Sequence, residues 1–267
     1  MTIDQLFAVI DAAPNKHSVE ISVSKDWSQG RTVYGGISAA LLYYACKLNV
    51  DSARVLRSLT TNFVGPLLSE QNFTITVEVL REGKNVSQLQ ARAIQEQKVA
   101  VVVQACFGEQ RQSKIEVKNE EVHNLPLPEK SNFIPQIPKI TPKFLRHFDL
   151  SIEKGGIPFT GKKQAQYYGW MRYKTAPAEI TDAHIVGIID AWPPTLLQML
   201  KWPSPASTVS WNLEFIHPHR PIGPTDWFAY KAETRQAAGG YGHTEATIWD
   251  KDGEVIALSR QTVAVFD

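Results

Sequence analysis

One carboxylate lies in the middle of the most apolar segment of this chain. The segment runs from His184 to Leu200, and Asp190 is its only ionisable side chain after His184. Apolar residues are dense on every face of the segment, which predicts a buried helix. Pro193 and Pro194 remove backbone donors and favour a break, so Asp190 is expected close to the N-terminus of a restarted helix.

A carboxylate is costly to bury unless it is hydrogen-bonded or paired, so Asp190 needs partners. Two interpretations stay open on this ground alone. Asp190 caps the helix that follows it by accepting hydrogen bonds from backbone amides, or it is a general base. A base in this apolar setting would hold a water molecule and take its proton as the water attacks a carbonyl carbon.

Other reactive patterns are weaker or missing. The chain has no Gly-x-Ser-x-Gly elbow, which argues against a serine hydrolase of that type. Its glycine pairs lack the remaining residues of a phosphate-binding loop. His217 and His219 point the same way on a strand, but a metal site needs a third ligand, and none is identifiable from the sequence. We therefore predict neither a metal site nor a cofactor.

The composition is that of an ordinary globular protein, with 43% hydrophobic and 21% charged residues among 267. Lys and Arg number 28 against 27 for Asp and Glu, so no global field recruits nucleic acid or an anionic membrane, and a small-molecule partner is expected. The N-terminus lacks the features of a signal peptide, and no stretch reaches membrane-spanning length. With only Cys46 and Cys106, a cytoplasmic protein with reduced thiols is expected.

The elements that must position Asp190 begin with a helix and a meander. Residues 18–24 alternate as in a strand, and Gly35 and Gly36 open an apolar helix that runs to about Ala45. Four strand-like runs follow, at about 54–63, 72–81, 86–95 and 99–107. A helix followed by an antiparallel meander is an α+β pattern.

The composition changes after Gly108 to Glu, Lys, Asn and repeated proline. The prolines are Pro126, Pro128, Pro135, Pro138 and Pro142. This stretch predicts a linker between two halves. The domain prediction is therefore an N-terminal unit of residues 1–110, a Pro-rich linker of 111–150 and a C-terminal unit of 151–267.

The order of the first half recurs after the linker. A strand at about 165–173 precedes the segment around Asp190, and further strands are expected at about 207–216, 227–236, 242–250 and 255–265. Local marks recur too: Phe63-Val64-Gly65-Pro66 matches Phe215-Ile216-His217-Pro218, and Gln104 matches Gln261. These repeats indicate a duplicated unit of helix plus antiparallel sheet, with the two copies side by side in one larger sheet.

The repeated marks resemble a known family, the double-hotdog acyl-CoA thioesterases of the thioesterase II type. In the first half the resemblance rests on Tyr34-Gly35-Gly36, on Phe63-Val64-Gly65-Pro66 and on the run 79–87. In the second half Asp190, Thr208 and Gln261 look like the family's catalytic Asp, Thr and Gln. The family's Phe-His-Arg-Pro-like string here has two extra residues, so Ser207 and Ser210 stay open as alternatives to Thr208.

The resemblance implies two tandem hotdog units, each a long helix packed on a curved antiparallel sheet, and hydrolysis of acyl-CoA to fatty acid and CoA. Asp190 would be the base, Thr208 and Gln261 would orient it and the water, and the Gly35 and Gly36 amides would stabilise the oxyanion. A homodimer of double hotdogs is also implied. Trp192, Trp211 and Tyr241 are predicted to line the acyl pocket.

Two alternatives remain on the same architecture. A hydratase or dehydratase acting on enoyl-CoA needs a histidine near the carboxylate, and His184 is the only one close to Asp190 in sequence. A non-catalytic acyl-CoA-binding module is suggested by the first half, which has no acid at its own helix break.

Overall fold

Eleven strands form one antiparallel sheet in the computed structural model, which describes residues 1–137 and 140–266. Pro138 of the predicted linker lies outside the described residues. The N-terminal half supplies β1 (Ser18–Ser22), β4 (Val55–Phe63), β5 (Asn72–Glu82), β6 (Val86–Gln95) and β7 (Lys98–Gly108). The C-terminal half supplies β8 (Phe148–Lys154), β9 (Gln166–Tyr173), β10 (Ala206–Phe215), β11 (Phe228–Ala238), β12 (Tyr241–Trp249) and β13 (Val255–Val265). The ranges predicted from alternation agree with these strands to within a few residues.

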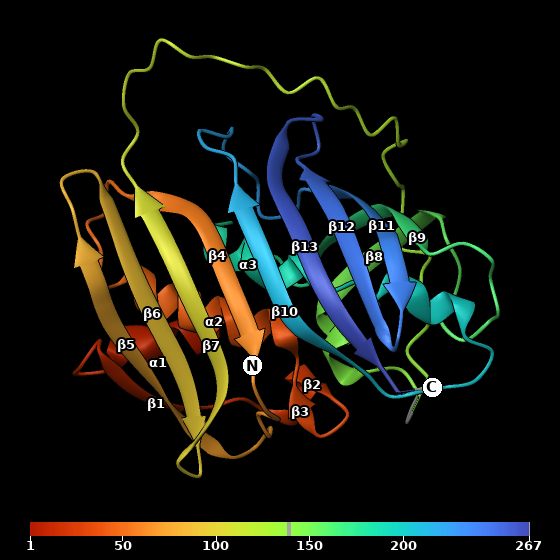
Figure 1. Cartoon of the computed structure of the whole chain (residues 1–267), viewed down its shortest axis with the longest axis horizontal. Coiled ribbons are helices and arrows are strands. Elements are labelled where there is room, and N and C mark those ends of the chain that lie inside the picture. The colour runs from red at the N-terminus through yellow and green to blue at the C-terminus, as the bar shows by residue number, and fades with distance from the viewer. Residues whose placement is uncertain (138–139, 267) are drawn as a thin grey trace.

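The strands are ordered β1-β5-β6-β7-β4-β10-β13-β12-β11-β9-β8 across the sheet. The central pair is β4 with β10, one strand from each half, and the order on one side of this pair mirrors the order on the other (Figure 1). Within the described eleven-stranded sheet, only β8 lacks a counterpart, since β1 corresponds to β9. The repeat predicted from the sequence therefore appears in the topology as well.

The register fixes which positions of the two halves correspond. The β4–β7 pair has an irregularity between Leu56 and Ser58, and the β10–β13 pair has one between Thr208 and Ser210. Both lie at the same distance in sequence before the matched residues Phe63 and Phe215. Leu56 is therefore the counterpart of Thr208.

The same register corrects one predicted correspondence. Leu59 and Trp211 are equally far from Phe63 and Phe215, and they pair with Ala105 and Gln261. The counterpart of Gln261 is thus Ala105, and the predicted match to Gln104 is wrong. Because side chains alternate along a strand, an offset of one residue changes the face, and Gln104 is exposed on the opposite side of the sheet.

In the part of the chain that the structure describes, three α-helices cover one face of the sheet (Figure 1): α1 (Ile3–Ala12), α2 (Gly35–Lys47) and α3 (Asp182–Ile189). The central helices α2 and α3 pack against each other, and the Tyr34 hydroxyl just before α2 donates to the Gly187 carbonyl of α3 at 3.0 Å. Both helices are apolar nearly all round because one side faces the sheet and another faces the partner helix. None of the described helices is long and apolar enough to cross a lipid bilayer.

The break predicted at Pro193 and Pro194 is present, but its consequence differs from the capping interpretation. Helix α3 ends at Ile189, Asp190 is its C-cap, and a short 3-10 segment, η3 (Thr195–Met199), follows the prolines. Pro194 is the N-cap residue of η3, which has no side-chain cap. The interpretation that Asp190 caps the helix after it is therefore wrong, and its carboxylate needs another partner.

The structure contains several short elements that the sequence patterns do not predict. Helix α1 begins with a capping box formed by Thr2 and Gln5, and Phe7 stacks on Tyr44 of α2 with ring centroids 4.3 Å apart. Two further 3-10 segments, η1 (Lys25–Trp27) and η2 (Lys143–His147), and a small sheet of β2 (Ser28–Gln29) and β3 (Thr32–Val33) are also present. The strand β8 begins at Phe148, inside the range predicted as linker.

From Glu109 to Pro142 the described chain has no helix or strand, and it arches along one end of the sheet (Figure 1).

Candidate active site

The carboxylate of Asp190 faces groups from both halves of the chain. Nε2 of Gln261, on β13, donates to its Oδ1 at 2.8 Å. The backbone amide of Gly36, in the first turn of α2, acts on the same carboxylate from the N-terminal half. The predicted pairing of Asp190 with Gln261 is thus present, and the helix start near Asp190 is that of α2 rather than that of the following segment.

This environment sets the charge state of Asp190. Burial raises the pKa of its carboxyl to about 7, while the hydrogen bond from Gln261 and the Gly36 amide hold the rise in check. A buried carboxyl resists ionisation because the charge loses its hydration, whereas donors favour the ionised form. A base with a pKa near the working pH is well suited to accept a proton and pass it on.

Close approach of α2 to Asp190 explains why the helix starts with glycines. A Cβ atom on Gly35 would lie 2.8 Å from Oδ2 of Asp190 and 3.1 Å from Cζ of Phe63. A Cβ atom on Gly36 would lie 2.7 Å from the Gly187 carbonyl oxygen. Real side chains do not tolerate such distances, so the glycines allow the helix N-terminus to reach the carboxylate.

Asp190 opens into a cavity of about 740 Å³ at the junction of the two halves. Its walls are mostly apolar and come from the first half, the linker region and the second half. Apolar residues that line it include Phe63, Val101, Ile134, Phe144, Leu145, Trp192 and Leu197. Gly35 lines it as well, whereas Gln261, which donates to Asp190, is not among the lining residues. The cavity can hold an extended apolar group whose polar end reaches Asp190.

Thr208 also lines the cavity, at the irregularity of β10. Its register partner is Val263, which lies two positions from Gln261 and hence on the same face of the sheet. Within the described residues its hydroxyl forms no hydrogen bond with Asp190. Of the two alternatives, Ser207 lines the cavity as well, whereas Ser210 is not among its lining residues.

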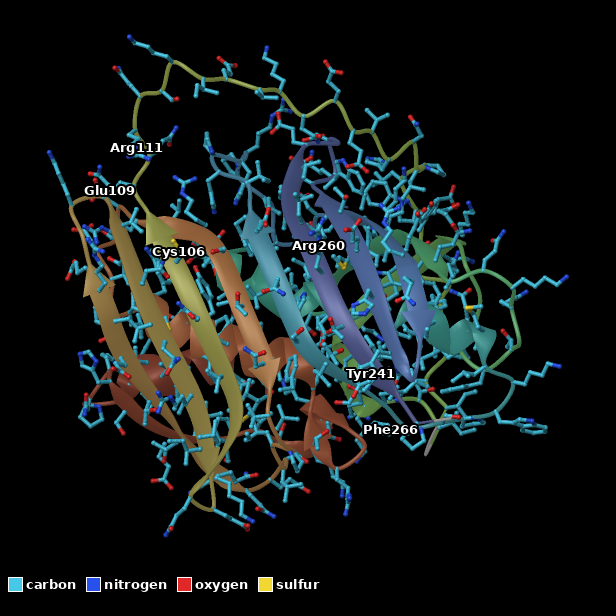
Figure 2. All side chains as sticks on the ribbon, viewed as in Figure 1. Cys106, Glu109, Arg111, Tyr241, Arg260 and Phe266 are labelled. Carbon is cyan, nitrogen blue, oxygen red and sulfur yellow. The ribbon has the colours of Figure 1, made fainter. Side chains whose placement is uncertain are left out.

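Of the three aromatic residues predicted to line the acyl pocket, only one lines the cavity. Trp192 is buried, lines the cavity and stacks on Tyr230 with ring centroids 5.6 Å apart. Trp211 is fully buried under the helices, with its Nε1 donating to Oγ of Ser259 at 2.9 Å, so its assignment to the pocket is wrong. Tyr241 is also wrong, because it lies at the start of β12 and is 51% exposed (Figure 2).

Much of the wall was missed because it comes from the predicted linker. Phe133 is buried and contacts Trp192, with centroids 5.1 Å apart, and Ile134, Phe144 and Leu145 line the cavity. The available signal was a set of apolar residues within a polar, proline-rich stretch. Such residues need a buried surface, and here that surface is the cavity and its aromatic wall.

His184 is engaged elsewhere. Its Nε2 lies 2.8 Å from Oδ1 of Asp4, and its Nδ1 lies 2.9 Å from the Thr181 hydroxyl, near the start of α3. Asp190 follows the opposite end of that helix. The histidine that a hydratase would need near the carboxylate is therefore not supplied by His184.

The two central helices on one face of a curved antiparallel sheet, with a carboxylate at the helix junction, place the chain among hotdog-fold proteins. A hot-dog-fold protein of unknown function from Alicyclobacillus acidocaldarius matches with a TM-score of 0.83 and 21% identity, over 98% of each chain. The tesB protein of Mycobacterium avium subsp. paratuberculosis matches with a TM-score of 0.79 and 16% identity, over 100% of each chain. At these identities the likeness shows the fold.

The sequence models give the family. The acyl-CoA thioesterase N-terminal domain matches residues 23–108, and the acyl-CoA thioesterase C-terminal domain matches residues 120–265. The chain belongs to the acyl-CoA thioesterase family and is a thioester hydrolase. It is also 27% identical over 254 residues to acyl-CoA thioesterase 2 of Haemophilus influenzae, with 86% of each chain covered.

Proposed function

We propose that this chain hydrolyses acyl-CoA thioesters with Asp190 as the general base. The observation that carries the proposal is the position of the Asp190 carboxylate. It is held by Gln261 and Gly36 at the wall of an apolar cavity of about 740 Å³. A carboxylate in that position has one side fixed by donors and the other side facing the space where a thioester would bind.

The proposed reaction uses this geometry. Asp190 accepts a proton from water as the water oxygen attacks the thioester carbonyl carbon, forming a tetrahedral intermediate with a negatively charged oxygen. Collapse of the intermediate breaks the carbon–sulfur bond, and the leaving CoA sulfur takes up the proton that Asp190 had accepted, which returns Asp190 to its ionised form. The products are a fatty acid and free CoA, so one water molecule is consumed for each thioester cleaved.

The two glycines take separate roles in this proposal. The Gly36 amide helps to hold Asp190, so it acts on the base. Gly35 lines the cavity at the first residue of α2, and its amide is the proposed donor to the oxyanion. The partial positive charge of the helix N-terminus supports this role, because charge develops on the oxygen only during the reaction.

Thr208 and Trp192 complete the proposed site. The Thr208 hydroxyl would hold the attacking water from the cavity wall, on the same sheet face as Gln261, which agrees with its place at the β10 irregularity. Trp192 would contact the acyl chain, since it lines the cavity and is fixed by stacking on Tyr230. Precise placement matters because an error of about 1 Å can cost on the order of a hundredfold in rate.

The test is release of free CoA from a series of acyl-CoA substrates of increasing chain length, followed with a thiol-trapping reagent. We expect turnover that is dependent on Asp190, with a chain-length optimum set by the cavity. Binding of acyl-CoA without CoA release would instead support the binding-module alternative. Addition of water to an enoyl-CoA without thioester cleavage would instead support the hydratase alternative.

We also propose that the halves are two tandem hotdog units, with residues 1–110 and 151–267 as the units and 111–150 as the linker. The mirrored strand order and the matched irregularities in β4 and β10 support the duplication.

The family resemblance further implies a homodimer, which light scattering on the purified protein would test. Two free thiols, Cys46 and Cys106, support a cytoplasmic location, testable by cell fractionation.

A further inference from the structure

The active site has a geometric counterpart at the other end of the α2–α3 helix pair. Asp190 follows α3 and meets Gly35 at the start of α2. Counted from the helix starts, the residue of α2 that corresponds to Asp190 is Tyr43, and the residue of α3 that corresponds to Gly35 is Asp182. Burial and then the Asp182 carboxylate raise the pKa of Tyr43, because the two side chains face each other.

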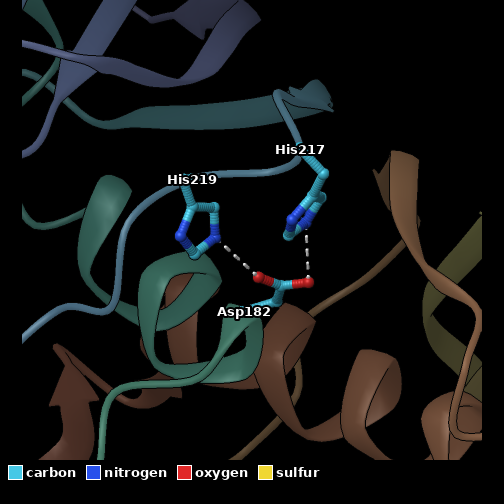
Figure 3. A group of neighbouring side chains, drawn as sticks. All are labelled: Asp182, His217 and His219. Atoms are coloured by element: carbon cyan, nitrogen blue, oxygen red, sulfur yellow. Dashed lines mark hydrogen bonds and ion pairs between the residues drawn. The ribbon is translucent and has the colours of Figure 1, made fainter. Parts of the chain in front are cut away.

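The loops after the central strands obey the same correspondence. After β4, residues Val64 to Leu67 line the active-site cavity. After β10, the matching segment places His217 and His219 beside Asp182 (Figure 3). At this mirror position the small and apolar residues of the cavity wall are thus replaced by two imidazoles and a carboxylate.

The three side chains converge on a small volume. Nε2 of His217 lies 3.1 Å from Oδ2 of Asp182, and Nε2 of His219 lies 3.5 Å from Oδ1. One ligand atom from each residue lies within 4.8 Å of the other two. The side chains are only 11%, 17% and 13% exposed for His217, His219 and Asp182, so they are largely shielded from solvent.

The tautomer of His219 indicates what belongs between these groups. Its Nδ1 lies 3.0 Å from the Arg220 carbonyl oxygen, an acceptor, so Nδ1 carries a proton. Its Nε2 is buried and has no hydrogen-bond partner among the described residues, and Oδ1 of Asp182 is farther than a typical N–H···O bond allows. Nε2 of His219 therefore faces the Asp182 carboxylate without a close hydrogen bond between the two groups, and a cation bound by both would occupy the space between them.

We propose that Asp182, His217 and His219 form a binding site for a divalent transition metal of the Zn²⁺ type. Ligand bonds of about 2.0–2.1 Å in a tetrahedral site separate neighbouring ligand atoms by roughly 3.3–3.4 Å. The three ligand atoms already lie within 4.8 Å of one another, so small side-chain movements would bring them to one ion. A backbone carbonyl that fixes the second nitrogen of a metal-bound imidazole is the usual support for such a ligand. Two imidazoles select against Mg²⁺ and Ca²⁺, which prefer oxygen ligands.

The neighbouring charges are compatible with a cation. The Lys47 ammonium is the nearby positive group on α2, and it donates to the backbone carbonyls of Ser52 and Arg54 at 3.2 and 2.6 Å. Asp250, from the end of β12, adds a negative charge that acts on His219. The site would fasten the loop after β10 to the start of α3, the helix whose opposite end carries Asp190.

His217 and His219 can be recognised as candidate ligands from the sequence, but the third ligand cannot. Asp182 lies 35 residues before His217, on a different element, so no spacing rule connects them. The prediction that the chain has no metal site rested on that missing ligand. The proposal replaces it and does not depend on the hydrolytic reaction.

The experiment uses the full chain, freed of any affinity tag and treated with a chelator, and titrates it with Zn²⁺ by calorimetry. We expect saturation at about one ion per chain and a higher melting temperature with Zn²⁺. The variants His217→Ala, His219→Ala and Asp182→Asn should each weaken binding by more than about tenfold, because loss of even an outer partner of a metal site costs that much. His243→Ala is the matched control, since His243 is exposed on β12, and it should bind as the parent does.

A second measurement does not depend on the stability of the variants. Co²⁺ bound at a site with two imidazoles and a carboxylate absorbs visible light much more strongly than hydrated Co²⁺. Added Zn²⁺ should displace the bound Co²⁺ and remove this absorption. Absence of a saturable site in the parent chain, or equal binding by the parent and the three variants, would overturn the proposal. In that case His219 is an imidazolium paired with Asp182, and the cluster holds a proton in place of a metal.

Discussion

The two halves have the same strand order, yet only the C-terminal half carries the side chains proposed for catalysis. Leu56 and Ala105 occupy the positions of Thr208 and Gln261, and both are buried and apolar. The N-terminal half contributes the glycine helix start and part of the cavity wall. One copy of the repeated scaffold therefore supplies the base and its orienting group, while the other supplies backbone donors and apolar surface.

The central helices of the two halves, α2 and α3, differ in length, and this difference also places the reactive group in the C-terminal half. Helix α2 has 13 residues and continues to Lys47, whereas α3 has 8 and ends just before Asp190. At the matching point α2 carries Tyr43 within an unbroken helix. The early end of α3, enforced by Pro193 and Pro194 a few residues later, brings a carboxylate to the cavity wall. A difference in helix length thus separates a packing position from a reactive one.

The largest effect is expected for Asp190→Asn, which removes the base and keeps the size of the side chain. Because general base catalysis contributes about 10²–10⁴-fold, kcat should fall by that factor in the CoA-release assay. Circular dichroism should show an unchanged fold. Asp252→Asn, the same change at the exposed turn between β12 and β13, is the control and should retain kcat. Full activity in Asp190→Asn would reduce Asp190 to a structural residue.

Gly35→Ala tests whether the first half must let its helix start approach the base. The added methyl would lie 2.8 Å from Oδ2 of Asp190, so the carboxylate has to move. A displacement of about 1 Å is expected to lower kcat by up to about a hundredfold. Gly65→Ala is the control on the same cavity wall, because its Cβ would meet only the Val99 carbonyl oxygen, at 3.8 Å. Equal rates for the two variants would contradict a tight approach at Gly35.

Gln261→Ala gives the C-terminal half the residue that the N-terminal half has at the matching position. A hydrogen bond to a charged group contributes about 1.5–3 kcal/mol, so kcat should fall by roughly 10–100-fold. Gln104→Ala removes the same side chain from the exposed face of β7 and should leave kcat unchanged. If both variants behaved alike, the register-based correspondence would carry no functional meaning.

The sequence allowed the strands to be predicted well and the site only in part. Alternation over 86–95 reproduces β6 because a half-buried strand shows its period directly. Asp190 and Gln261 were found from residue type and family resemblance. The Gly36 contact and the third member of the Asp182 cluster were not, because both depend on contacts between elements that are distant in the chain.

The errors have physical causes as well. Trp211 and Tyr241 were placed in the pocket by residue type, whereas the strand face and the position along the strand decide their burial. The match of Gln104 to Gln261 rests on the similarity of the short sequences around them. Such similarity does not reveal that the two side chains, one residue apart in register, point to opposite faces of the sheet. The walls supplied by residues 133–145 were hidden in a segment whose composition indicates a linker.

The pH dependence of kcat/KM tests the environment of the base. Asp190 must be ionised to accept a proton, and its pKa is about 7. The rate should therefore fall about tenfold per pH unit below 7 and level off above it. Gln261 donates to the ionised form, so Gln261→Ala should move the midpoint to higher pH. A midpoint near 4 in the parent chain would show that the carboxylate is hydrated and outside the proposed environment.

The smallest effect is expected for Thr208→Val, which keeps the β-branched shape that suits the strand and removes only the hydroxyl. Thr208 makes no hydrogen bond with Asp190 in the described residues, so its proposed role is limited to holding the attacking water. A hydrogen bond between neutral groups contributes about 0.5–1.5 kcal/mol, which corresponds to a decrease in kcat of roughly 2–10-fold.

Ser207→Ala decides which hydroxyl of β10 performs this role. Both residues line the cavity, but Ser207 is exposed and its Oγ lies 3.3 Å from the Thr208 carbonyl oxygen. Loss of rate in Ser207→Ala with none in Thr208→Val would transfer the role to Ser207. The expected pattern is the reverse, because Thr208 shares the sheet face of Gln261 and its counterpart in the first half, Leu56, is buried beneath the helices.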